Sequence, residues 1–249
     1  MSSVDQLRKK IKNSNASIGT WMQIPSSEIA EILSATKSYD WIVVDMEHGT
    51  FSRDQLPSIV RSIEINSVLP FVRLQTNTVK SAKDVIDSGF LGFIVPMVEN
   101  KEQLENIYKA ITYPPLGKRG VGFAKSNQYG INFKNELESQ FEPYLVAMIE
   151  TSLGLKNLEQ ILSTDSLDAI IVGPYDLSAS LGVCGEFDSP KFKKAYDLIR
   201  DLCAEYNIPF GFHLINPCNK QLKKTIEDGA KFIAFSMDSV MLHSLRPNL

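Results

Sequence analysis

The sequence predicts an α/β protein whose strands and helices form a single (β/α)8 TIM barrel. Short β-branched or apolar runs alternate with longer segments of helical period, which is typical of repeated βα units around a parallel sheet. Eight such units are found, and 249 residues is the usual size of this barrel. A doubly wound open sheet usually needs fewer strands and a reversal of strand order, so the barrel is favoured.

The second, fourth and sixth strand candidates are near-continuous apolar runs, as expected of strands that are covered on both faces. The eight strand candidates are residues 17–23, 41–45, 69–73, 91–96, 145–150, 169–172, 210–213 and 232–236. The segments between them place Ile, Leu and Val at three- and four-residue spacings, as in 28–36 and 103–111, and are predicted to be helices.

The composition favours one domain over residues 1–249, with 43% hydrophobic and 22% charged residues. A net charge of −3 gives no reason to expect a nucleic acid or an anionic membrane as a partner. Three cysteines without zinc-type spacing favour a reducing cytoplasm, and no segment has the apolar length of a membrane span. The first 17 residues are polar and charged, and no export signal is recognised there.

The longest irregular stretch is residues 113–134, which contain two prolines and four glycines. It is predicted to be a long loop that follows the fourth barrel helix. Long ordered loops on barrels often cover active sites.

Polar residues close several of the apolar strands, at the end of the barrel where such enzymes place their chemistry. Glu150 ends the fifth strand, and Asp176 follows the sixth through a Gly-Pro turn. Two carboxylates give a hard divalent cation two oxygen ligands and leave positions for water and substrate. Helix caps or surface ion pairs are the competing explanation, and the spacing of the two residues does not by itself decide between them.

Two further side chains lie at predicted strand ends. Arg73 closes the third strand, where a guanidinium suits capture of a carboxylate or stabilisation of an enolate oxygen, or else forms a structural ion pair. His48 lies in a loop after the second strand and could take a proton directly or through a water, although a lone histidine is more often structural. The turn at Gly173 directs the backbone N–H groups of Tyr175 and Asp176 towards a possible substrate carboxylate. No predicted strand carries a central lysine, which argues against an imine-forming aldolase.

Seven motifs in a fixed order resemble those of the HpcH/HpaI aldolase/citrate lyase family. They are GTWMQIPSSEIAEIL, YDWIVVDMEHG, PFVRLQ, GFIVPMVENKEQ, YPPLGKRGVG, MIETSLGLKNLEQIL and IIVGPYDLSASLG. This family comprises class II pyruvate aldolases such as 4-hydroxy-2-oxoheptanedioate aldolase and 2-dehydro-3-deoxyglucarate aldolase. Its barrel is of the phosphoenolpyruvate/pyruvate superfamily type, and the resemblance covers almost the whole chain.

The resemblance implies a role for each matching residue. The implied metal ligands are Glu150 and Asp176, with Mg²⁺, Mn²⁺ or Co²⁺ as the ion. Arg73 would contact the pyruvyl oxygens, and His48 would be the general base, oriented by Asp87. Asp45 matches the acid at the end of the second strand, and Trp21 matches an aromatic residue that shapes the site. The backbone at Gly173 and Tyr175 would bind the substrate carboxylate.

Some positions depart from the family pattern. Met148 stands where well-known members have a glutamine near the bound pyruvate, so it is expected to line the substrate site without that polar contact. Tyr175, Met46 and Phe123 replace smaller residues and add bulk near the mouth. The short tail after the last strand puts in doubt a C-terminal helix that swaps between subunits, although a homo-oligomer is still expected.

The implied activity is cleavage or formation of a 4-hydroxy-2-oxo acid, with pyruvate and an aldehyde as the small-molecule partners. Another metal-enolate lyase on the same barrel, such as an acyl-CoA lyase or a 2-oxo acid decarboxylase, is the first alternative. A catalytically silent barrel is the second, but such a scaffold has no physical need for Glu150, Asp176, Arg73 and His48 together.

Overall fold

A closed barrel of eight parallel strands forms the centre of the molecule, which confirms the predicted fold. The computed structural model describes residues 3–13, 15–138 and 141–246. The strands are β1 (Ser17–Met22), β2 (Trp41–Asp45), β3 (Leu69–Arg73), β4 (Gly92–Val95), β5 (Tyr144–Ile149), β6 (Ala169–Val172), β7 (Phe210–Leu214) and β8 (Phe232–Met237). Three of them have the predicted bounds, and the others differ by one or two residues at their ends.

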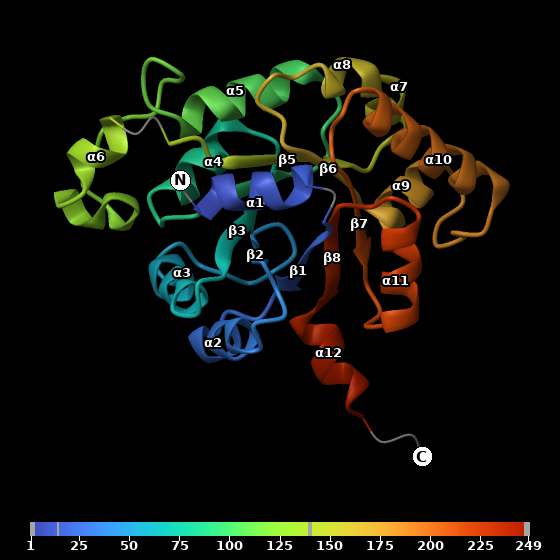
Figure 1. Ribbon diagram of the computed structural model, residues 1–249, viewed down its shortest axis with the longest axis horizontal. Helices are drawn as coiled ribbons and strands as arrows, with labels where there is room; N and C mark the ends of the chain where they lie inside the picture. The colour runs from blue at the N-terminus through green and yellow to red at the C-terminus, as the bar shows by residue number, and fades with distance from the viewer. Residues whose placement is uncertain (1–2, 14, 139–140, 247–249) are drawn as a thin grey trace.

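Helices surround the barrel, and all of the described ones except the first and the last lie between consecutive strands in the chain (Figure 1). Those before β5 are α1 (Ser3–Lys12), α2 (Ser27–Ala35), α3 (Leu56–Glu64), α4 (Val79–Ile86), α5 (Lys101–Ile111), the 3-10 helix η1 (Lys125–Gly130) and α6 (Phe133–Glu138). Those after it are α7 (Ser152–Lys156), α8 (Leu158–Leu162), α9 (Pro174–Ser180), α10 (Pro190–Glu205), α11 (Asn219–Glu227) and α12 (Asp238–Ser244). None of the described helices has the length and apolarity of a membrane span.

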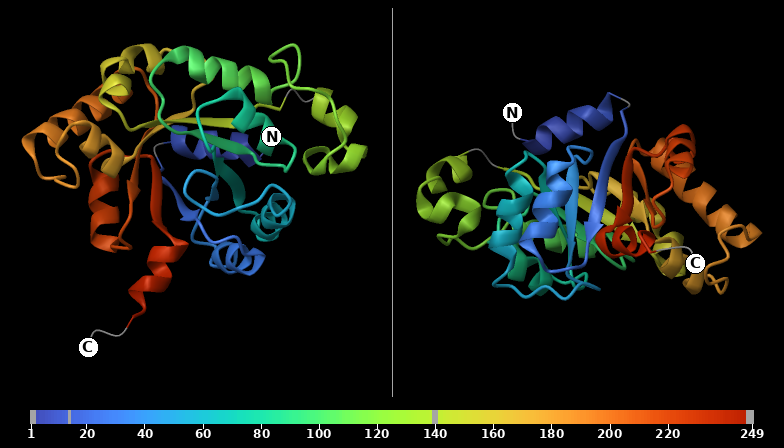
Figure 2. Two further views of the ribbon diagram at one scale, coloured as in Figure 1. Left: turned by 180° about the vertical axis from the view of Figure 1, so that it is seen from behind. Right: turned by 90° about the horizontal axis from the view of Figure 1, so that it is seen from below.

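The first helix, which was not among the helices predicted from the sequence, closes one end of the barrel. The apolar face of α1 consists of Val4, Leu7 and Ile11, and it joins the cluster of aromatic side chains at the amino ends of the strands. Arg8 donates to both carboxylate oxygens of Asp168, at 2.6 and 2.9 Å. Figure 2 shows α1 lying across this end. Three apolar residues among charged ones gave too weak a periodicity to be recognised.

Inside the barrel, side chains of alternate strands form layers. Strand pairing places inward residues of β2, β4, β6 and β8 at one level: Val43, Ile94, Ile171 and Ala234. The inward residues of β1, β3, β5 and β7 at the neighbouring level, nearer the carboxyl ends, are Trp21, Arg73, Met148 and His213. All four are at most 5% exposed, so this upper layer is the floor beneath the carboxyl ends of the strands.

Candidate active site

A buried ion pair lies at the carboxyl ends of β2 and β3. Arg73 donates from Nε to Asp45 Oδ1 at 2.8 Å and from Nη2 to Oδ2 at 2.7 Å. Strand pairing sets Asp45 directly beside Arg73, so the two strand ends fix the bidentate geometry. Burial opposes the charge on Asp45, but the guanidinium outweighs it and lowers the pKa of that carboxyl.

A second carboxylate lies against the same guanidinium. Glu47 Oε2 is 2.9 Å from Arg73 Nη1, an ion pair that lacks the alignment of a hydrogen bond. The guanidinium carbon also lies over the Trp21 ring, 5.6 Å from its centroid. Because carboxylates and an aromatic ring surround it, the guanidinium of Arg73 is held in one orientation. Burial opposes its positive charge, but the neighbouring carboxylates outweigh burial and raise the pKa of Arg73.

Glu150 follows β5 directly and is 2% exposed. The backbone N–H of Met97 donates to its Oε2 at 2.7 Å. Burial raises the pKa of Glu150 to about 7, and the negative charges of Glu47 and Asp176 act in the same direction. A carboxyl at this pKa is half ionised near neutral pH, so a cation at this position would favour its charged form.

The turn after β6 approaches Glu150 closely. Gly173 precedes α9, and a Cβ atom built on it would lie 2.7 Å from Glu150 Oε1 and 3.0 Å from Met148 Cε. A side chain here would displace the carboxylate. Asp176 lies in the first turn of α9 and is exposed, while Tyr175 is 50% exposed and packs edge-on against Phe187.

The structure places His48 at the mouth but Asp87 elsewhere. His48 is exposed, and its backbone N–H donates to Asp45 Oδ1 at 3.2 Å. Asp87 instead accepts a hydrogen bond from Arg119 Nη2 at 3.1 Å. Because α4 runs back towards the amino ends of the strands, its C-cap residue Asp87 lies at the opposite end of the barrel. Within one chain, Asp87 therefore does not orient His48.

The segment after α5 also differs from its prediction. Residues 113–134 include η1 and run into α6, so they are not a structureless loop. The segment connects a helix to the next strand and therefore belongs to the end of the barrel opposite the site. Arg119 with Asp87 and Lys125 with Glu64 attach it there, and it projects from the barrel in Figure 1. In this chain it does not cover the barrel mouth, and Phe123 is 71% exposed on it, away from the site.

Three residues near the mouth were not predicted to belong to the site. Glu47 follows the strand-ending Asp45 by two positions and could have been recognised from its place beside His48. His213 lies on β7, and its ring stacks on Trp21 with centroids 4.6 Å apart; burial lowers its pKa to about 4. Gln23 donates to Asp45 Oδ2 at 3.1 Å; it lies within the first family motif, but the resemblance implied no role for it.

The carboxylates at the mouth suit a divalent metal ion. Burial raises the pKa of both Glu47 and Glu150, the negative charge of nearby Asp176 acts on both in the same direction, and Arg73 is the positive group that opposes it. Among the described residues no three His, Cys, Asp or Glu side chains are arranged to hold a metal by themselves. An ion bound by two carboxylates would therefore complete its shell with water and substrate oxygens, as Mg²⁺ does.

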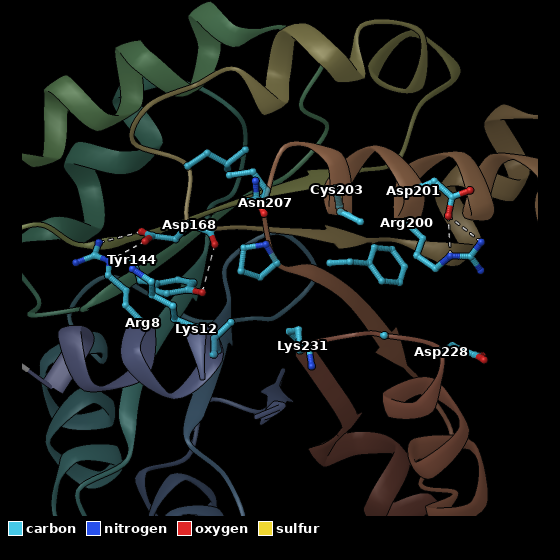
Figure 3. A pocket seen from close by; sticks show the side chains of 17 residues that line it. Arg8, Lys12, Tyr144, Asp168, Arg200, Asp201, Cys203, Asn207, Asp228 and Lys231 are labelled. Carbon is cyan, nitrogen blue, oxygen red and sulfur yellow. Dashed lines mark hydrogen bonds and ion pairs between the residues drawn. The ribbon is translucent and has the colours of Figure 1, made fainter. Parts of the chain in front are cut away.

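A separate cavity of about 900 Å³ lies at the amino ends of the strands, between α1 and α10 (Figure 3). Two ion pairs border it, Arg8 with Asp168 and Arg200 with Asp201. It shares no lining residue with the group around Arg73 and Glu150, and barrel enzymes place their chemistry at the other end. We therefore assign the candidate active site to the carboxyl ends of the strands.

Comparison with known proteins identifies the family and the fold. The model of the HpcH/HpaI aldolase/citrate lyase family matches residues 17–244. The chain is 30% identical to the hydroxypyruvate/pyruvate aldolase of Roseobacter denitrificans, covering 96% of this chain and 93% of the relative. It is 31% identical to the 4-hydroxy-2-oxovalerate aldolase of Novosphingobium aromaticivorans, covering 95% and 89%. An HpcH/HpaI family protein from Burkholderia cenocepacia has the same fold, with a TM-score of 0.89, 24% identity, and coverage of 96% and 95%.

Proposed function

Since this chain belongs to the HpcH/HpaI aldolase/citrate lyase family, we propose that the group around Arg73 and Glu150 is the site at which it cleaves and forms 4-hydroxy-2-oxo acids. The protein is a carbon–carbon lyase of the class II aldolase type, as its relatives are. The observation that carries the assignment is the fixed guanidinium of Arg73 beside the carboxyl of Glu150, whose pKa is raised by burial. One group is positioned to stabilise an anion, and the other favours a cation.

Members of the family depend on a divalent metal ion, and we assign Glu150 and Asp176 as the ligands that would hold it here. Mg²⁺, Mn²⁺ and Co²⁺ all suit oxygen ligands of this number. When bound, the ion would act as a Lewis acid that polarises the 2-oxo group of the substrate. The first turn of α9, with the backbone N–H groups of Tyr175 and Asp176, is the proposed seat of the substrate carboxylate.

The chain's own residues supply the remaining chemistry. In the cleavage direction, His48 removes the proton from the 4-hydroxyl group, and the carbon bearing it becomes an aldehyde as the C3–C4 bond breaks. The bonding electrons pass into the 2-oxo acid fragment as an enolate, whose oxygen charge develops beside Arg73. Protonation at C3 then gives pyruvate. Trp21 and Met148, in the layer below, form the apolar floor that excludes water from this carbanion.

Other reactions of the same enolate are the first alternative. Citrate lyases share the family, and a 2-oxo acid decarboxylase would need the same guanidinium and carboxylates. The relatives named above are aldolases, which favours aldol chemistry for this chain. A silent barrel is disfavoured because a scaffold has no need of a buried carboxyl, that of Glu150, near the fixed guanidinium of Arg73 at the strand ends.

Pyruvate release from a panel of 4-hydroxy-2-oxo acids tests the function, with added Mg²⁺, Mn²⁺ or Co²⁺ and with EDTA. We expect turnover that EDTA abolishes. His48→Ala, assayed in parallel, should slow aldol cleavage by about 10²-fold or more but affect oxaloacetate decarboxylation much less, because that reaction removes no hydroxyl proton. Turnover that survives EDTA would exclude the metal, and equal losses in both reactions would exclude His48 as the base.

The pKa of Glu150 predicts how a metal ion should stabilise the protein at different pH. Without metal, its contribution to stability is full below its usual pKa of 4.5 and is lost as the pH rises through about 7, because the buried group must then ionise. A bound cation offsets that loss. We therefore expect Mg²⁺ to raise the unfolding temperature more at pH 8 than at pH 5.5, measured by scanning calorimetry. Glu150→Gln is the control and should show no such difference; an equal shift at both pH values in the unmodified protein would contradict the prediction.

We propose three further properties of this protein. The chain acts as one domain in the cytoplasm, for which its three free cysteines are the support. It forms a homo-oligomer, for which the support is a set of exposed apolar side chains on the segment after α5. These are Val121, Phe123, Tyr129 and Ile131, each at least 64% exposed. Light scattering of the purified protein would test whether it is an oligomer. A monomer at micromolar concentration would exclude the homo-oligomer.

A further inference from the structure

We propose that Gln23 is a positioning residue for Arg73 and that it acts by fixing the carboxylate of Asp45. The proposal rests on the function assigned above, because Arg73 is the group that would stabilise the enolate. Gln23 lies immediately after β1 and connects the start of α12 with the ends of β2 and β3. It lies within the first of the seven family motifs, GTWMQIPSSEIAEIL, but it was not predicted to belong to the site.

The backbone of Gln23 is held by a buried acid. Asp238, at the start of α12, is 2% exposed, and both of its carboxylate oxygens accept from the Gln23 N–H at 3.0 Å. The same carboxylate accepts from the N–H of Ile24 at 2.9 Å and of Ser239 at 2.7 Å. Three backbone donors on one carboxylate lock the end of β1 to the beginning of α12.

The side chain of Gln23 is held at both ends of its amide. Ser239 Oγ donates to Oε1 at 3.2 Å, and Nε2 donates to Asp45 Oδ2 at 3.1 Å. The reverse orientation would set the amide oxygen against the ionised Asp45, so the chemistry of the neighbours fixes the direction of the amide. Gln23 therefore presents an N–H group to Asp45 in a defined direction.

This N–H completes the set of donors around Asp45. Oδ2 is shared by Gln23 and by Arg73 Nη2, whereas Oδ1 accepts from Arg73 Nε and from the backbone N–H groups of Glu47 and His48. A bidentate pair requires the carboxylate and the guanidinium to lie nearly in one plane. With donors on both oxygens, the carboxylate cannot rotate out of that plane without breaking hydrogen bonds.

The absence of charge on the Gln23 amide matters as much as the direction of its N–H group. A lysine here would compete with Arg73 for Asp45, and an ionised acid would repel Asp45. An amide adds a directed donor and leaves the balance of charge at the site unchanged. Gln23→Leu, which removes the hydrogen bonds at similar volume, should therefore lower kcat by about 10-fold or more while the unfolding temperature stays within a few degrees. Gln160→Leu, on the exposed face of α8, is the matched control and should change neither quantity.

Gln23→Glu provides a readout that a purely structural role would not move. A protonated glutamic acid can donate to Asp45 as the amide does, but an ionised one cannot. The variant should therefore keep most of its kcat at low pH and lose it as the pH rises, relative to the unmodified protein at each pH. Unchanged kcat in Gln23→Leu, or a loss in Gln23→Glu that is the same at every pH, would overturn the proposal.

A measurement without substrate separates this proposal from the assigned function. Exchange of the Arg73 Nε proton with solvent, followed by ¹⁵N NMR and assigned by the loss of its signal in Arg73→Lys, reports directly on the Arg73–Asp45 pair. We expect exchange in Gln23→Leu to be about 10-fold faster or more. If the protein lacks aldolase activity but exchange accelerates, the function fails and the positioning role stands. If the protein is an aldolase and exchange is unchanged, the positioning role fails.

Discussion

Replacement of Glu150 by glutamine should lower metal-dependent turnover by about 10³-fold or more, the largest single effect expected in this protein. The amide keeps an oxygen that can accept from Met97, so the local fold is preserved, but it removes the negative charge that would bind the ion. The variant should also gain stability without metal at neutral pH, since the group that resists ionisation is gone. Pyruvate release and Mg²⁺ titration by calorimetry measure the loss of turnover and of metal binding, and thermal unfolding without metal measures the gain in stability.

The matched control is Glu159→Gln, which makes the same chemical change on an exposed position of α8. It should leave turnover and Mg²⁺ binding unchanged. If Glu150→Gln kept its metal-dependent turnover to within about 10-fold, Glu150 would not be a metal ligand.

Arg73→Lys should reduce kcat by about 10²-fold or more, although the positive charge is kept. Lysine carries one ammonium group and cannot reproduce the planar fork that engages both oxygens of Asp45 while facing Glu47. The enolate would lose a preorganised donor, and the free energy of unfolding should fall by about 1–3 kcal/mol because buried carboxylate oxygens lose partners. Steady-state kinetics and urea unfolding provide the two measurements.

Arg53→Lys provides the comparison, because the Arg53 side chain is 64% exposed and its nearest approach to Asp84 is 3.8 Å. A loose surface pair of this kind contributes little, so we expect neither kcat nor stability to change. Equal behaviour of the two lysine variants would mean that charge alone, rather than the fork of Arg73, serves the reaction.

The barrel and the strand-end residues were predictable because they follow a local rule. Each strand is an apolar run of four to six residues, and the polar side chain that ends it must lie at the carboxyl end of the barrel. Asp45, Arg73 and Glu150 were therefore located from the sequence pattern, without knowledge of their contacts. Their assignment to chemistry still needed the resemblance to a family, since two strand-end acids alone fit a structural role equally well.

The features that were missed depend on contacts between distant residues. Asp87 pairs with Arg119 because α4 runs towards the amino ends of the strands, so that its C-cap residue lies far from the barrel mouth. The position of residues 113–134 follows from the same rule, because a connection from helix to strand lies at the opposite end from one that leads from strand to helix. Gln23 is recognisable only when α12 is seen beside the end of β1, some 215 residues later in the chain.

The helix that closes the barrel has a consequence for synthesis of the chain. Arg8 and its partner Asp168 are separated by 160 residues, so α1 cannot dock until most of the barrel has been made. At about 5–20 residues per second, that interval is roughly 8–30 s on the ribosome. During it, Val4, Leu7 and Ile11 have no barrel to cover and remain available to chaperones. The helix α1 thus leaves the ribosome well before Asp168 but reaches its place only after that residue has been made.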